Sequence, residues 1–102
     1  MLPAIYRLYQ NYPNPFNPST TISFDLPEES RVMLEIYDIT GRKIRVLAEG
    51  RYPAGSHRVV WDGRDSNGQA VASGVYAYRL RVFAPMGKAG RHVTTRKLLL
   101  MK

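Results

Sequence analysis

Three prolines fall within six residues near the start of the chain, at Pro13, Pro15 and Pro18. Each proline fixes its own φ, and its ring keeps the preceding residue out of the helical region. The segment is therefore predicted to be a stiff, extended lead-in, neither a helix nor an inner strand of a sheet, ending where residues 19–21 begin a strand. It carries two aromatic side chains, Tyr12 and Phe16, which need an apolar surface, whereas a flexible linker would be rich in Gly and Ser. We expect this segment to dock onto a β-domain; the alternative is a stiff spacer that contacts nothing.

Apolar and polar residues alternate along most of the chain, which is the period of a β-strand. One face collects Val32, Leu34 and Ile36 in one segment and Tyr76, Tyr78, Leu80 and Val82 in another, with Arg79 and Arg81 on the reverse of the second. Such alternation is typical of strands buried on one side only, as in an antiparallel sandwich.

Strands are predicted near residues 4–10, 20–26, 31–39, 43–48, 56–62, 74–84 and 91–101. Turn signals separate them, at 27–30, 40–41, 50–55, 62–74 and 85–90. About seven short strands in about 100 residues predict an all-β fold, an immunoglobulin-like antiparallel β-sandwich with Trp61 in its core.

The chain has 102 residues, which is enough for one domain, and it has no cysteine, so disulfides and thiolate metal sites are excluded. No apolar run approaches the roughly 20 residues that a transmembrane helix needs. The first residues lack the charged and apolar regions of a signal peptide.

Lysine and arginine number 15 against 8 acidic residues, a net charge of +7. Such a charge steers a protein toward anionic partners, here nucleic acid, an acidic polysaccharide or lipopolysaccharide. The absence of helix-turn-helix, zinc-finger and RNP-like patterns disfavours nucleic acid. The alternative is that outward-facing cations protect sheet edges from pairing with other chains. The arginines concerned are Arg42, Arg45, Arg58, Arg79, Arg81 and Arg96.

The loop over residues 62–69 is the most site-like segment, because Asp62, Asp65 and Asn67 could offer oxygens to calcium. Their spacing does not fit an EF-hand in either register. Asn67 followed by Gly68 is a strong hairpin-turn signal, and Asp65 can form an Asx-turn. Turn chemistry is the favoured interpretation, and we predict no metal and no cofactor.

The two histidines, His57 and His92, are far apart in the sequence and are not accompanied by a nucleophile-elbow pattern. A small sandwich also offers little concavity for a catalytic pocket. Since His57 alternates with Val59 and Trp61, it is expected at the edge of the same face. We predict no enzymatic activity.

Five blocks of sequence, in a fixed order, carry a family resemblance. They cover residues 9–22, 34–42, 54–57, 61–65 and 72–80, and a terminal strand ending in Lys102 follows them. Together they resemble the C-terminal sorting domains of the bacterial type IX secretion system, which are allied to the immunoglobulin-like module of flagellar hook-capping proteins. The resemblance runs from about Leu8 to Lys102.

The resemblance implies a structural framework and a recognition segment. The framework residues are Pro13, Pro15, Phe16, Pro18, Gly41, Trp61, Asp62, Gly63, Gly74 and Tyr76. The secretion signal would comprise Thr95, Arg96, Lys97, Leu98, Leu99, Leu100, Met101 and Lys102. If the protein ends at Lys102, the last strand offers free edge groups, which suit strand addition by a receptor. Leu98 and Leu100 fall on one face of this strand, and Leu99 and Met101 fall on the other, so burial on both faces is predicted. A basic patch at Arg96 and Lys97 is the other interpretation.

The resemblance also implies a cellular setting. Residues 1–10 would be a linker remnant with a first strand, and residues 11–102 the sorting domain of a secreted or surface-attached protein. Its partners would be the outer-membrane type IX machinery and an upstream cargo domain in the same chain, and we expect the domain to be a monomer.

Two other classes of protein remain open. One is a structural module like that of hook-capping proteins. The other is a carbohydrate-binding module attached to an enzyme, which would need an exposed row of aromatics such as Tyr37, Tyr52 and Phe83.

Overall fold

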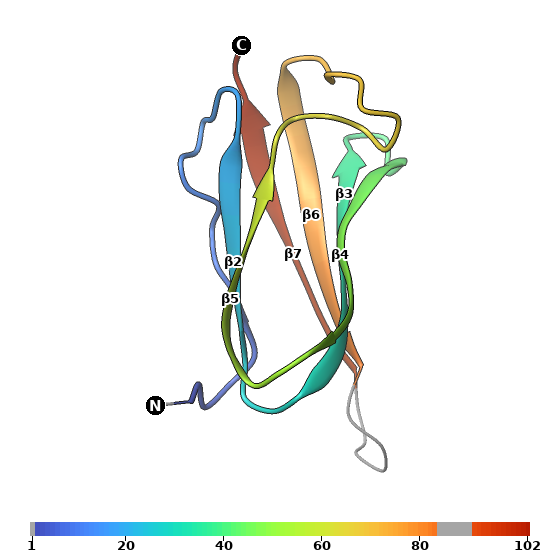
Figure 1. Ribbon diagram of the computed structural model, residues 1–102. Helices are drawn as coiled ribbons and strands as arrows, with labels where there is room; N and C mark the ends of the chain where they lie inside the picture. Colours follow the sequence, from blue (N-terminus) through green and yellow to red (C-terminus); the bar gives the residue numbers. More distant parts are fainter. Residues whose placement is uncertain (1, 84–90) are drawn as a thin grey trace.

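The computed structural model describes residues 2–83 and 91–102, and its regular elements are all β-strands. They are β1 (Arg7–Leu8), β2 (Thr20–Leu26), β3 (Ser30–Asp38), β4 (Lys43–Tyr52), β5 (Gly55–Trp61), β6 (Gly74–Phe83) and β7 (Arg91–Leu100). A three-stranded sheet in the order β1-β2-β5 faces a four-stranded sheet in the order β4-β3-β6-β7 (Figure 1). All pairings are antiparallel, which confirms the predicted immunoglobulin-like sandwich. In the described part of the chain no helix could cross a membrane.

The strand bounds follow the predicted ones closely, with two corrections. The first strand is only Arg7–Leu8, and β4 continues to Tyr52 because Val32 pairs with Gly50 and Ser30 with Tyr52. The predicted turn at 50–55 therefore shrinks to Pro53 and Ala54. Residue 84, the predicted turn at 85–90 and Met1 lie outside the described residues.

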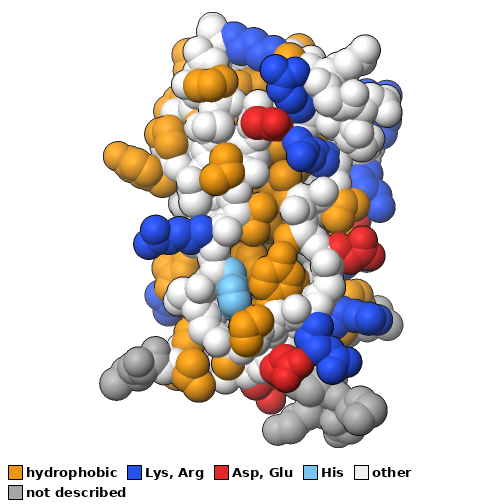
Figure 2. All heavy atoms as spheres, in the orientation of Figure 1, with side chains coloured by type: hydrophobic (Ala, Val, Ile, Leu, Met, Phe, Trp, Pro, Cys, Tyr) orange, Lys and Arg blue, Asp and Glu red, His pale blue; other side chains and the backbone are white. Residues whose placement is uncertain are grey.

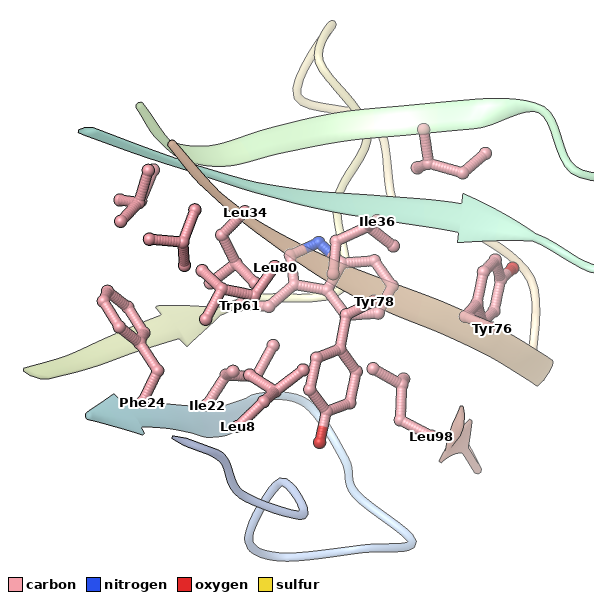
Figure 3. Packing of buried hydrophobic residues seen from close by; sticks show 14 of the residues in the cluster. Leu8, Ile22, Phe24, Leu34, Ile36, Trp61, Tyr76, Tyr78, Leu80 and Leu98 are labelled. Carbon is pink, nitrogen blue, oxygen red and sulfur yellow. The ribbon is translucent and has the colours of Figure 1, made fainter. Parts of the chain in front are cut away.

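The core lies between the sheets and takes alternate residues from each strand. Ile22 and Phe24 of β2 face Leu34 and Ile36 of β3 across it, and all four are fully buried (Figure 3). Leu26 at the end of β2 is fully buried too. The inner face of β6 contributes the predicted set, Tyr76, Tyr78, Leu80 and Val82. Trp61 is completely buried, as expected.

The proline arm, defined here as residues 9–18, is docked, but only one of its two aromatics is buried. Phe16 is 2% exposed and contacts Trp61, with ring centroids 5.6 Å apart. Tyr12 is 80% exposed, so the expectation that it packs is wrong. Its backbone pairs with Thr21, which alternates with buried neighbours, and the pairing directs the side chain of Tyr12 outward with that of Thr21.

Candidate functional site: the C-terminal strand and the arm along its edge

The predicted recognition residues lie in the second half of β7 and directly after it. Leu98 and Leu100 face the core and are 2% and 1% exposed. The alternate residues face outward: Lys97 is exposed, Leu99 is half-buried, and Met101 is 55% exposed. The expectation that both faces are buried is therefore wrong, because the fold has two layers and, among the described residues, no strand lies on the outward face of β7.

The edge of β7 over residues 97–101 is occupied by the proline arm. The Phe16 N–H donates to the Leu99 carbonyl and the Met101 N–H donates to the Phe16 carbonyl, both at 3.0 Å. The Leu99 N–H donates to Asn14 Oδ1 at 3.0 Å, and Gln10 Nε2 donates to the Lys97 carbonyl at 2.8 Å. The expectation of free edge groups in this half of the strand is thus wrong.

The first half of β7 is flanked differently. The ring of Tyr6 stacks on His92 at 5.2 Å, and Arg96 Nε donates to the Leu8 carbonyl at 2.7 Å. Among the described residues, no strand or arm backbone pairs with the outer edge of β7 at Val93 or Thr95. The chain from residue 6 to 16 therefore runs beside β7 in the same direction, with backbone pairing only at the far end.

Tyr78 of β6 fastens the middle of the arm to the core. Its hydroxyl accepts a hydrogen bond from the Asn11 N–H at 2.9 Å and donates one to the Tyr9 carbonyl at 2.6 Å. Burial raises the pKa of Tyr78 to about 12, although the Asn11 N–H and Arg96 favour the ionised form. Asn11 is itself 2% exposed, and its amide donates to the hydroxyl of Thr20 at 3.0 Å.

Three of the predicted framework residues, Phe16, Trp61 and Tyr76, meet around the end of the arm. Trp61 lies between Phe16 and Tyr76, and its Nε1 donates to the Arg64 carbonyl at 2.9 Å. The Tyr76 hydroxyl donates to the Ala72 carbonyl at 2.6 Å, which ties β6 to the loop before it.

Gly63 marks the point where the arm, β7 and the loop after β5 touch. Its φ is +74°, and a Cβ there would lie 3.3 Å from the Pro18 carbonyl oxygen and 3.9 Å from Leu100 Cδ2. Glycine is therefore needed both for the backbone conformation and for the close approach.

The remaining framework residues serve turns and the arm. Gly41, with φ of +88°, donates its N–H to the Asp38 carbonyl in the turn between β3 and β4, and Gly74 opens β6. Pro13 and Pro15 are exposed, and the Pro13 carbonyl accepts a hydrogen bond from the Thr20 hydroxyl at 2.8 Å.

In the loop over residues 62–69, the carboxylate oxygens of Asp62 and Asp65 are used in contacts with other groups of the protein. Asp65 Oδ1 accepts from the N–H groups of Asn67 and Gln69 at 2.9 and 3.0 Å, which is the predicted Asx-turn. Asp62 Oδ1 lies 2.8 Å from Arg45 Nη1 and also accepts from the Arg64 N–H. Within residues 2–83 and 91–102, no three His, Cys, Asp or Glu side chains are grouped to hold a metal ion.

A charged network covers the outer face of the four-stranded sheet. Glu35 is only 2% exposed, and its carboxylate lies 3.1 Å from Lys43 Nζ and 3.2 Å from Arg81 Nε. The contact with Arg81 lacks hydrogen-bond alignment, so it acts through charge alone. Arg79 lies over the ring of Tyr37, 4.9 Å from its centre.

Of the six arginines named from the sequence, only Arg79 and Arg81 lie on this surface, because Arg42 pairs with Asp38 in a turn, Arg45 pairs with Asp62, and Arg96 bonds the Leu8 carbonyl. Among the described residues the cations of this basic face are Arg31, Lys43, Arg51, Arg79, Arg81 and Lys97, and its acids are Glu35 and Glu49. Arg58, by contrast, lies on β5 in the other sheet.

The exposed row of aromatics that a carbohydrate-binding module would need does not form from Tyr37, Tyr52 and Phe83. Tyr37 is on the outer face of β3, whereas Tyr52 faces inward and packs edge-on against Phe24 and His57 at 5.8 and 5.2 Å. His57 also contacts Phe24 at 5.3 Å, and its Nε2 lies 2.8 Å from the Pro53 carbonyl. This histidine is at the edge of the core, as expected.

Comparison with known proteins gives the family and three related folds. A model of the FlgD Ig-like domain matches residues 12–83. Dimeric latent PorU from Porphyromonas gingivalis has a TM-score of 0.73 at 23% identity, with 95% of this chain and 10% of that chain covered. FlgD from P. aeruginosa has a TM-score of 0.63 at 29% identity, with 79% of this chain and 61% of that chain covered.

The third fold is PorZ of Porphyromonas gingivalis, described as an essential bacterial surface component of the type IX secretion system. Its TM-score is 0.51 at 25% identity, with 95% of this chain and 11% of that chain covered. A search of curated proteins found no match. This chain thus corresponds to about a tenth of PorU and PorZ and to less than two thirds of FlgD.

These findings confirm the resemblance drawn from the sequence. The domain is an immunoglobulin-like sandwich of FlgD type, and a type IX secretion component is among its structural neighbours. Because the family model matches more than half of its residues, this chain belongs to the FlgD Ig-like domain family.

Proposed function

We propose that the chain is a non-catalytic sorting domain of an exported protein, recognised by the outer-membrane machinery of type IX secretion through residues 95–102. The cargo would be a domain upstream in the same protein, and the mature protein would be secreted or attached to the cell surface.

The observation that carries the proposal concerns β7. The FlgD family model stops at residue 83, before this strand begins, while the likeness to PorZ covers 95% of the chain. The strand β7 therefore lies outside the match to the FlgD model and within the likeness to a type IX secretion component. In this strand and directly after it, Lys97, Leu99 and Met101 present side chains that the core does not use.

A test must separate recognition from folding, because Leu98 and Leu100 belong to the core and a truncation would remove both. Residues 8–102 would be fused to a fluorescent reporter with a Sec signal, in a host with a working type IX system. The double variant Lys97→Ala/Met101→Ala changes an outward-facing position of β7 and the exposed residue directly after the strand. Its matched control, Arg58→Ala/Val60→Ala, changes two exposed positions of β5.

We expect export of the wild type and of the β5 control, and periplasmic retention of the β7 variant with an unchanged melting temperature. Export of the β7 variant at the wild-type level would contradict the recognition segment. Retention of a folded wild-type reporter would contradict the sorting function itself.

A second function is favoured by the likeness to FlgD, which has 29% identity over 79% of this chain. In that case the domain would be a structural module like that of hook-capping proteins, and none of the reporters would be exported. A carbohydrate-binding module is not proposed, because Tyr37 and Tyr52 lie on opposite faces of the sheet.

A further inference from the structure

The backbone groups of β7 alternate between two directions. Leu98 and Leu100 pair with Tyr76 and Gly74 of β6. The bonds from Leu99 and Met101 to the arm show that the odd-numbered residues point their N–H and carbonyl groups to the outer edge. Val93 and Thr95 have the same parity, and among the described residues no other strand bonds to them there.

The arm covers this edge incompletely. Pro13, Pro15 and Pro18 have no N–H, so the arm cannot form a continuous ladder with β7. Two of its contacts are made by the side chains of exposed residues, Gln10 and Asn14. Of the arm residues that bond to β7, only Phe16 combines a buried ring with two backbone bonds, and it lies at the end of the strand. Bonds of exposed groups open most easily in a native protein.

We propose that the outer edge of β7 from Val93 to Leu99 is a strand-acceptor site, and that Gln10 and Asn14 gate it. Its occupant is an extended polypeptide segment of the partner, which adds to the four-stranded sheet through backbone hydrogen bonds. Such a segment donates N–H groups where the arm has prolines, so it makes more bonds than the contacts it displaces. The Phe16–Leu100 bridge stays in place and ends the site.

This inference rests on the proposed sorting function and specifies how the partner binds. Backbone hydrogen bonds to the added strand supply affinity, and outward side chains such as Lys97 and Met101 supply specificity. A proline substitution can test the role of this edge. Proline at position 95 removes an N–H that points outward, and it leaves the bonds between β7 and β6 intact.

The test compares Thr95→Pro with Thr95→Ala in the reporter assay. Both variants lose the contact between the Thr95 hydroxyl and Arg79 Nε, and they differ in the proline ring and the outward N–H that it removes. We expect Thr95→Pro to be retained in the periplasm although it is folded, and Thr95→Ala to be exported more than Thr95→Pro, because the alanine keeps the outward N–H. Export of folded Thr95→Pro at the level of Thr95→Ala overturns the inference and leaves the sorting function standing. Retention of the folded wild type overturns both.

The gate gives a second measurement, which decides the matter if Thr95→Pro does not fold. Asn14→Ala removes the acceptor for the Leu99 N–H, and Asn17→Ala is its control in the same arm, since Asn17 makes no side-chain hydrogen bond to the described residues of β7. At limiting expression we expect about fivefold more export of Asn14→Ala than of Asn17→Ala, the effect of one hydrogen bond. Equal or lower export of Asn14→Ala overturns the gate and the acceptor site.

Discussion

At the scale of single residues, Tyr78 links the arm to the core with one hydroxyl group. That group satisfies the Asn11 N–H and the Tyr9 carbonyl, which would otherwise be left without a partner beside buried side chains. An unsatisfied buried polar group costs about 1–3 kcal/mol. The docking of the arm therefore depends on a residue more than sixty positions away in the sequence.

The first prediction concerns Tyr78→Phe, which should lower the free energy of unfolding by about 1–3 kcal/mol at pH 7. The pH profile gives a second readout. In the folded protein the pKa of Tyr78 is about 12, above the ordinary 10.0. The neutral phenol therefore contributes its full stabilisation of the fold below pH 10, and this stabilisation is lost as the pH rises to about 12. Measured by urea unfolding, the free energy of unfolding of the wild type should fall by about 2–3 kcal/mol between about pH 10 and about pH 12. The fall should be smaller in the variant. Parallel profiles of the two proteins would contradict this.

The second prediction uses two glycines of one loop. Gly63 and Gly68 have similar φ values, +74° and +81°, but a Cβ at Gly68 would meet nothing within 4 Å. Gly68→Ala should cost about 1 kcal/mol of backbone strain. Gly63→Ala should cost more, because the Pro18 carbonyl must also move. Chemical denaturation measures both, and equal losses would show that the contact between arm and loop adds nothing to stability.

At the scale of elements, the strands were predictable and the docking of the arm was not. A period of two is a local pattern, so the bounds of β2, β6 and β7 could be predicted to within a residue or two. The contacts of Gln10 and Asn14 join side chains to backbone groups 87 and 85 residues away, and no local pattern encodes them. The burial of Phe16 and the exposure of Tyr12 likewise depend on which strand each one pairs with.

The third prediction concerns the charge network between β3, β4 and β6. Glu35→Gln should lower stability by about 1–2 kcal/mol, because Lys43 and Arg81 lose a buried counter-charge while both remain partly hydrated. Glu29→Gln is the control, since its pair with Arg51 is exposed on both sides and should contribute almost nothing. Thermal melts at low and high salt measure both variants. A loss as small as that of the control would mean that Glu35 is dispensable.

At the scale of the whole molecule, the two long sides of the sandwich differ. The arm closes the side between β2 and β7. On the other side, where β5 faces β4, hydrophobic side chains line a furrow between the strands (Figure 2). The two sheets also differ in their cations. The outer face of the four-stranded sheet carries the set given above, whereas the described strands of the other sheet carry Arg7 and Arg58.

The fourth prediction tests that unevenness. Arg31→Gln and Arg58→Gln remove the same charge from opposite sheets. If the basic face binds polyanions, Arg31→Gln should elute from a sulfated-dextran column at lower salt than Arg58→Gln, because only the first removes a phosphate- or sulfate-binding cation from the patch. Identical elution would mean that the column responds to net charge and not to a face.

The parallel course of arm and β7 has a mechanical consequence. Tyr6 stacks on His92 near the start of β7, and Met101 directly follows the end of that strand, so the two residues lie at opposite ends of β7 (Figure 1). A force that pulls these two ends apart acts along the arm and β7 in opposite senses. The bonds that Asn14 and Phe16 make to β7 are then stretched together, in shear, and are not broken one after another. If a cargo pulled on the N-terminal side of the domain while a partner held β7, the force would load these bonds in shear, the direction in which they resist rupture most.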